Sequence, residues 1–64
     1  MREEFNIEYK GRRYNFELDK KDGMIWLIQD DNLKSKTNSG QIIPARNIDE
    51  AKETAKLMLY SMGY

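Results

Sequence analysis

The chain has 64 residues, 39% of them hydrophobic, and its 11 basic and 11 acidic side chains cancel to a net charge of zero. It contains neither cysteine nor histidine, which excludes disulfides, thiolate metal sites and the side chain that titrates near neutrality. No apolar run approaches the length of a membrane span, so we expect a cytoplasmic protein that forms one domain over residues 1–64. A domain this small has a marginal hydrophobic core, which leaves association as its means of extra stabilisation.

Two segments near the start of the chain alternate between apolar and polar residues, as half-buried β-strands do. Their apolar positions are Phe5, Ile7, Tyr9, Tyr14, Phe16 and Leu18. Between them, Gly11-Arg12 predicts a two-residue turn with glycine at its first central position. That turn pairs every apolar residue with another one across the hairpin, Ile7 with Phe16 for example.

Residues 24–28, Met-Ile-Trp-Leu-Ile, are apolar at every position, so a strand here presents apolar side chains on both faces of its sheet. Residues 19–23 are polar and end in glycine, which predicts a turn before this strand. We expect Leu18 to lie opposite Met24. The third strand then continues the antiparallel sheet of the first two.

This pairing divides the apolar run between the two faces of the sheet. Trp26 joins the core face beside Phe16, and Ile25 and Leu27 are left on the opposite, open face. Two neighbouring large aliphatic side chains on an open face indicate a contact surface, because exposed apolar patches usually mark binding sites. The alternative is that residues 33–40, a weak edge strand or a loop, fold over them.

The C-terminal segment carries a helical pattern. Asn47 with Glu50 three residues later fits a capping box, and Gly63 predicts the end of the helix. The apolar stripe at helical spacing comprises Ile48, Ala51, Ala55, Met58, Leu59 and Met62. Leu57 and Tyr60 lie outside that stripe, and residues 41–43 before Pro44 are a candidate for a short last strand.

Together these elements predict an α+β fold. The expected architecture is a three- or four-stranded antiparallel sheet with one C-terminal helix packed on one face. The order of strands followed by a helix resembles, in topology, the arm-type DNA-binding domains of tyrosine recombinases. With Asp49-Glu50-Ala51 opening the helix, it is also similar to the small antitoxin domains of the HicB type.

Catalytic chemistry has few candidate residues in this chain. The close acidic pairs, Asp19 with Asp22 and Asp30 with Asp31, fall in predicted turns, where aspartate is common because it bonds the local backbone. No set of residues meets the criteria for named catalytic roles. We therefore expect a protein that is not an enzyme and has no cofactor and no metal site.

The leading hypothesis is a non-enzymatic protein-interaction module that acts through the open sheet face. Small chains of this kind are often regulators or inhibitors of a larger protein, including phage-encoded ones, or they form homodimers. The expected interface residues are Ile25, Leu27, Leu57 and Tyr60. The expected partner is another protein or a second copy of the chain, and no membrane.

The alternative hypothesis is a nucleic-acid-binding module. Basic side chains cluster at the two predicted hairpin tips, and such turns beside tyrosines can contact phosphates and stack on bases. The residues are Lys10, Arg12, Arg13, Lys20 and Lys21. A net charge of zero argues against an interface dominated by phosphate contacts.

Overall fold

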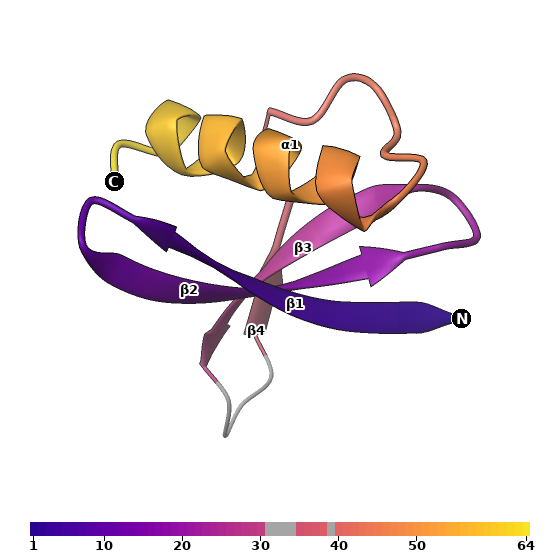
Figure 1. The fold of residues 1–64 in the computed structure, drawn as a ribbon, viewed down its shortest axis with the longest axis horizontal. Helices are drawn as coiled ribbons and strands as arrows, with labels where there is room; N and C mark the ends of the chain where they lie inside the picture. The colour runs from indigo at the N-terminus through magenta and orange to yellow at the C-terminus, as the bar shows by residue number, and fades with distance from the viewer. Residues whose placement is uncertain (31–34, 39) are drawn as a thin grey trace.

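The chain forms an antiparallel sheet with one helix across it in the computed structural model, which describes residues 1–30, 35–38 and 40–64 (Figure 1). The elements are β1 (Arg2–Tyr9), β2 (Arg12–Asp19), β3 (Met24–Asp30), β4 (Ser35–Thr37) and α1 (Ile48–Ser61). The four described strands lie in the order β1-β2-β3-β4. The predicted α+β fold is confirmed.

The first hairpin forms, but its turn lies one residue earlier than predicted. Lys10 and Gly11 occupy the turn with φ of 53° and 80°, and Tyr9 pairs with Arg12. Positive φ at both central residues gives the turn the twist that suits a two-residue hairpin. The pairing therefore shifts by two residues, which keeps every side chain on its predicted face. Phe5 now lies opposite Phe16, and their rings stack with centroids 5.6 Å apart.

The register of β3 differs from the prediction by one residue, and this reverses its two faces. Leu18 pairs with Ile25 instead of Met24. A four-residue turn, 20–23, sets this register: Gly23 adopts a φ of 75°, and its N–H donates to the carbonyl of Asp19 at 2.7 Å. The expectation that Trp26 lies in the core is therefore wrong.

The same reversal overturns the prediction that Ile25 and Leu27 are exposed. They are 0% and 2% exposed and lie in the hydrophobic core beneath α1. Residues 24–28 are apolar at every position, so alternation alone could not choose between the two registers. The turn at residues 20–23 selects the observed register.

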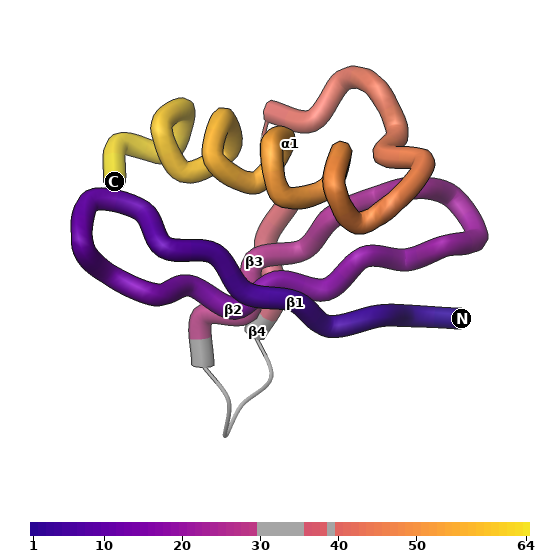
Figure 2. The backbone as a smooth tube through the Cα atoms, in the orientation of Figure 1, coloured from indigo at the N-terminus to yellow at the C-terminus, as the bar shows by residue number. Residues whose placement is uncertain are grey.

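Helix α1 covers the core face of the sheet and packs as predicted (Figure 2). Of the predicted stripe, Ala51, Ala55, Met58 and Leu59 are buried, and Ile48 and Met62 are partly buried against the core. Ala51 and Ala55 have no exposed surface. Their small side chains let the helix axis approach the strands closely.

Both ends of α1 follow the sequence signals. Asn47 caps the start, since its side-chain oxygen accepts the Glu50 N–H at 2.9 Å. At the other end Gly63 has a φ of 87°, and the Tyr64 N–H returns to the carbonyl of Leu59 at 3.0 Å, as in a Schellman motif. This return folds the last residue back towards the sheet.

The segment after β3 is only partly described. Residues 31–34 and 39 lie outside the described residues. They include Asp31, which the sequence places in a predicted turn with Asp30, and part of the segment 33–40. Within that segment, β4 pairs with β3.

Residues 41–43 do not form the short strand expected there. The side chain of Gln41 takes its place, with Oε1 accepting the Ile25 N–H at 2.8 Å and Nε2 donating to the Gly23 carbonyl at 2.8 Å.

Candidate protein-interaction surface

The predicted interface residues separate into two groups. Ile25 and Leu27 are in the core and are not available at the surface of the folded chain. Leu57 and Tyr60 are 68% and 74% exposed on the outer side of α1. Of the four predicted interface residues, Leu57 and Tyr60 are therefore the two that the folded chain leaves at its surface.

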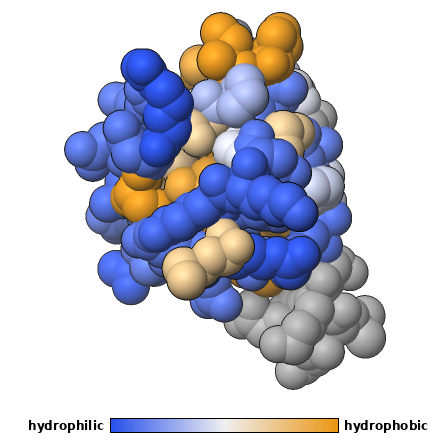
Figure 3. All heavy atoms as spheres, turned by 90° about the vertical axis from the view of Figure 1, so that its right-hand side faces the viewer, coloured by the Kyte–Doolittle hydropathy of each residue, from blue (hydrophilic) through white to orange (hydrophobic). Residues whose placement is uncertain are grey.

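Two further exposed aliphatic side chains lie in the loop that leads into α1. Ile42 is 92% exposed and Ile43 is 76% exposed. Apolar side chains gather at the top of the molecule in Figure 3, where Figure 1 places this loop. The short strand expected at residues 41–43 would have left one of these two isoleucines as a candidate for the contact surface, because successive side chains of a strand point to opposite faces. Their exposure follows from the absence of that strand.

The loop is fixed to the sheet on its inner side. Besides the two bonds of Gln41, the side-chain amide of Asn38 donates to the Ile25 carbonyl at 2.7 Å and to Gln41 Oε1 at 2.8 Å. The Ala45 N–H donates to the Gly23 carbonyl at 2.9 Å.

The loop also packs directly on the 20–23 turn. A side chain at Gly23 would place its Cβ 2.6 Å from the Cβ of Pro44, so no space separates the two. Ile42 and Ile43 are therefore presented by an anchored segment.

A groove of about 740 Å³ runs between this loop and α1. Ile43 and Pro44 line one side, and Thr54 and Glu53 line the helix side. Leu57 follows Thr54 by three positions and Glu53 by four, so it continues the same helix face one turn further on. We call the surface formed by Ile42, Ile43, Leu57 and Tyr60 the helix-side ridge.

One ion pair lies at the groove entrance. The Arg46 guanidinium contacts the Glu50 carboxylate at 2.8 Å, and the Arg46 backbone N–H donates to the same carboxylate at 2.9 Å. The side-chain hydrogen bond, followed by the backbone one, holds the pKa of Glu50 below its ordinary value. The side-chain bond and the negative charge of Glu50 raise the pKa of Arg46. The Glu50 carboxylate thus accepts the backbone N–H of Arg46. The capping box had instead predicted that it accepts the backbone N–H of Asn47.

The open sheet face carries a charged cluster around Trp26. Glu17 is only 8% exposed, and its carboxylate accepts from Lys36 Nζ at 2.7 Å, with Arg2 3.7 Å away. These residues, Trp26 and Asp19 line a cavity of about 420 Å³. Because the chain's own lysine already neutralises the buried carboxylate, the cluster stabilises the sheet face and leaves no unmatched charge for a ligand.

The five basic residues do not form one surface. Lys10, Arg12 and Arg13 lie at the β1–β2 turn, whereas Lys20 and Lys21 lie at the β2–β3 turn. The whole length of β2 separates these turns, which stand at opposite ends of the molecule in Figure 2. Lys20 also forms an ion pair with Glu3 at 2.7 Å.

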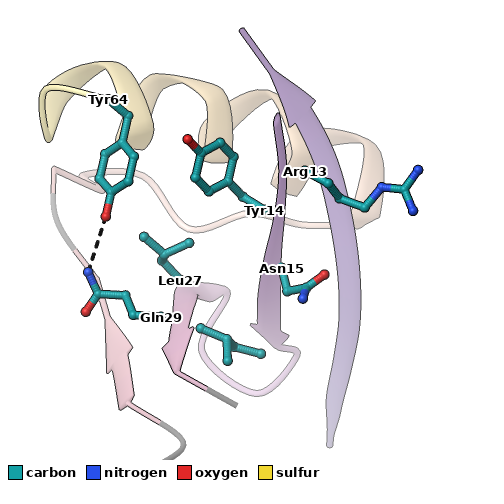
Figure 4. A pocket seen from close by; sticks show the side chains of 7 residues that line it. Arg13, Tyr14, Asn15, Leu27, Gln29 and Tyr64 are labelled. Atoms are coloured by element: carbon teal, nitrogen blue, oxygen red, sulfur yellow. Dashed lines mark hydrogen bonds between the residues drawn. The ribbon is translucent and has the colours of Figure 1, made fainter. Parts of the chain in front are cut away.

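A second cleft lies beside the first basic group, at the end of the sheet. The pairing of β2 with β3 stops at Asn15 and Ile28, and the strands beyond enclose a cleft of about 460 Å³. The rings of Tyr14 and Tyr64 meet edge to face there, 5.4 Å apart, and Gln29 Nε2 donates to the Tyr64 hydroxyl at 3.3 Å (Figure 4). Arg13 lines this cleft, although its guanidinium points away from the tyrosines.

The described residues contain no group of three or more acidic side chains placed to hold a metal ion. Across the same ranges, no helix combines the length and the apolar character required to cross a bilayer. The fold and these surfaces define a small α+β domain with an exposed apolar ridge on its helix side. No family model, no curated protein and no solved structure matches the chain.

Proposed function

We propose that this chain is a non-enzymatic protein-binding module whose contact surface is the helix-side ridge. The observation that carries the proposal is the exposure of Ile42 and Ile43 on an anchored loop. Ile43 lines a groove whose helix side includes Thr54, and exposed Leu57 follows Thr54 one helical turn later. Fully burying one such side chain contributes about 1.5–3 kcal/mol. A partner that covers this ridge gains that energy without having to order the loop first.

The biological role that fits this surface is that of a small regulator or inhibitor of a larger protein. The domain offers the partner a fixed apolar surface with a groove beside it, and hydrophobic side chains that insert into such grooves dominate many interfaces. A chain without cysteine also suits a reducing compartment, so the proposal places this module in the cytoplasm.

The test is affinity capture with matched variants. Immobilised wild-type chain is compared with Ile43→Lys and with Leu57→Lys, which place a charge in the ridge, and with Asn6→Lys, which places the same charge on the exposed sheet face. We expect a defined partner to bind the wild type and Asn6→Lys and to be lost from both ridge variants. A partner that binds all four chains equally would contradict the proposal.

The second candidate function is binding of single-stranded nucleic acid at the β1–β2 tip. It is supported by the tyrosine cleft beside Lys10, Arg12 and Arg13, because aromatic side chains next to cations suit stacked bases and phosphates. We expect binding, if this function holds, to weaken steeply with added salt and to disappear in Arg12→Glu/Arg13→Glu. The absence of any mobility shift with single-stranded DNA or RNA at low salt would end it.

A further inference from the structure

The outer edge of β1 is a second surface, separate from the helix-side ridge. Among the described strands, β1 pairs with β2 alone and stands at the edge of the sheet (Figure 1). In an antiparallel pair, successive residues direct their backbone groups alternately to the two sides of the strand. Tyr9 and Arg12 close the two-residue turn and form a hydrogen-bonded pair, so the odd-numbered residues of β1 face β2. The Met1 carbonyl, which accepts the Lys20 N–H at 2.9 Å, also belongs to an odd-numbered residue that bonds towards β2.

The even-numbered residues of β1 therefore direct their N–H and C=O groups away from the sheet. These residues are Arg2, Glu4, Asn6 and Glu8. The edge is eight residues long and contains no proline, and its pairing with β2 runs from Arg2 to Tyr9 without a shift. The opposite edge differs, because β4 has three residues and its pairing with β3 is shifted between Ile28 and Asp30. Short, irregular edges resist pairing, and long regular ones invite it.

The charges along β1 indicate which strand fits this edge. If a second β1 runs antiparallel about a two-fold axis at Phe5, Arg2 lies opposite Glu8 of the second copy and Glu4 lies opposite Asn6. An axis at Asn6 would instead place Glu4 opposite Glu8, and an axis at Glu4 would place that carboxylate opposite itself. Opposite charges across a strand pair stabilise it and like charges destabilise it. Among the registers that pair most of β1, the one centred on Phe5 thus joins opposite charges and places no like charges opposite each other.

The side chain at the centre of this register is also suited to the contact. Phe5 is 9% exposed and stacks on Phe16 inside its own chain. With the axis at Phe5, the two copies of this residue form a non-hydrogen-bonded pair, in which side chains approach most closely. Aromatic pairs at such positions contribute to sheet stability.

We propose that the β1 edge binds a second copy of this chain, antiparallel and centred on Phe5, to form one sheet that continues across both copies. The added strand pair satisfies the outward backbone groups of Arg2, Glu4, Asn6 and Glu8 in both copies. It also supplies the association that a domain of this size uses as extra stabilisation. This contact uses the backbone edge of β1 and none of the residues of the helix-side ridge, so the inference does not rest on the proposed function.

The first test uses proline at an outward-facing backbone position. Sedimentation equilibrium should show a reversible dimer for the wild type and for Asn6→Ala, and an association constant lower by about tenfold or more for Asn6→Pro. Because the Asn6 N–H points away from β2, proline there removes no bond of the β1–β2 ladder. A circular-dichroism melt at low concentration verifies that the variant is folded. In concentrated wild type, exchange of the Glu4 and Asn6 amide hydrogens should slow.

The second test fixes the register and does not depend on proline. Arg2→Glu and Glu8→Arg should each lose self-association, because each places like charges opposite one another. Mixed together, the two variants should form a heterodimer with opposite charges at both positions. A wild type that stays monomeric at millimolar concentration would overturn the inference. So would a dimer that Asn6→Pro leaves intact, or one that is lost in Ile43→Lys, since that dimer would use the ridge.

Discussion

The two faces of β3 have nearly the same composition and opposite surroundings. Ile25 and Leu27 are at most 2% exposed beneath α1, whereas Met24, Trp26 and Ile28 are partly exposed on the face away from the helix. Nothing in the hydrophobicity of these five residues separates the two sets. Which set is buried depends on the register of the strand, and a register change of one residue exchanges them.

The neighbours of the two faces show how the protein accommodates an apolar residue on its open side. Beneath α1, Leu27 lies opposite Phe16 in a core of apolar side chains. On the open side, Trp26 lies opposite Glu17, whose carboxylate is bonded to Lys36. The long side chains around the indole cover part of it while their charged groups stay paired or hydrated. Partial exposure of Trp26 is therefore a stable arrangement of the monomer.

The largest effect expected from this comparison is that of a charge on the covered face. Leu27→Lys buries an ammonium group with no partner among the core residues, which costs several kcal/mol. A domain of this size has about 3–10 kcal/mol of stability in total. We expect the variant to be largely unfolded by circular dichroism. A folded Leu27→Lys chain with an unchanged melting temperature would show that this face is not the core.

A matched pair of isoleucines compares the two faces directly. Ile25→Ala should lower the free energy of unfolding by about 2–5 kcal/mol, because the residue is fully buried and leaves a cavity. Ile28→Ala, the same substitution three residues later on the open face, should cost about 1 kcal/mol. Urea denaturation of both variants measures the difference. Equal losses would contradict the asymmetry between the faces.

The charged cluster on the open face predicts a smaller effect. Glu17→Gln removes the negative charge that pairs with Lys36 and leaves only a hydrogen bond from the ammonium group to a neutral amide oxygen, which should cost about 1 kcal/mol. Glu53→Gln, the same substitution at an exposed position of α1, is the control and should change stability by no more than about 0.5 kcal/mol. Both are measured by thermal melts at low concentration. If the two variants lose the same amount, Glu17 and Lys36 are not coupled.

The smallest predicted effect concerns the pair at the start of α1. Because the pKa of Glu50 is lower in the folded chain than its ordinary value of 4.5, the folded state favours the ionised carboxylate. Its stabilising contribution is present above the ordinary pKa and is lost as pH falls through the lowered one. The melting temperature of Glu50→Gln should therefore fall less than that of the wild type between neutral and acidic pH. The pair is exposed, so salt should reduce the difference.

Most of the fold could be predicted from local patterns. The two alternating strands, the helix stripe, the Asn47 cap and the Gly63 stop each depend on residues close in sequence, and each is confirmed. The candidate surface was predicted only in part. Leu57 and Tyr60 were found because a helix has a known period, whereas Ile42 and Ile43 required knowing that side chains of Asn38 and Gln41 replace a strand.

The sequence by itself determined that this protein is a small α+β domain with more apolar surface on β3 than one sheet face can bury. Only the tertiary structure decided which half of that surface is covered. The reason is physical: helices and alternating strands follow from periods within a segment, but a uniformly apolar strand satisfies both registers equally. The turn at Gly23, closed by its bond to Asp19 and packed beneath Pro44, selects between them.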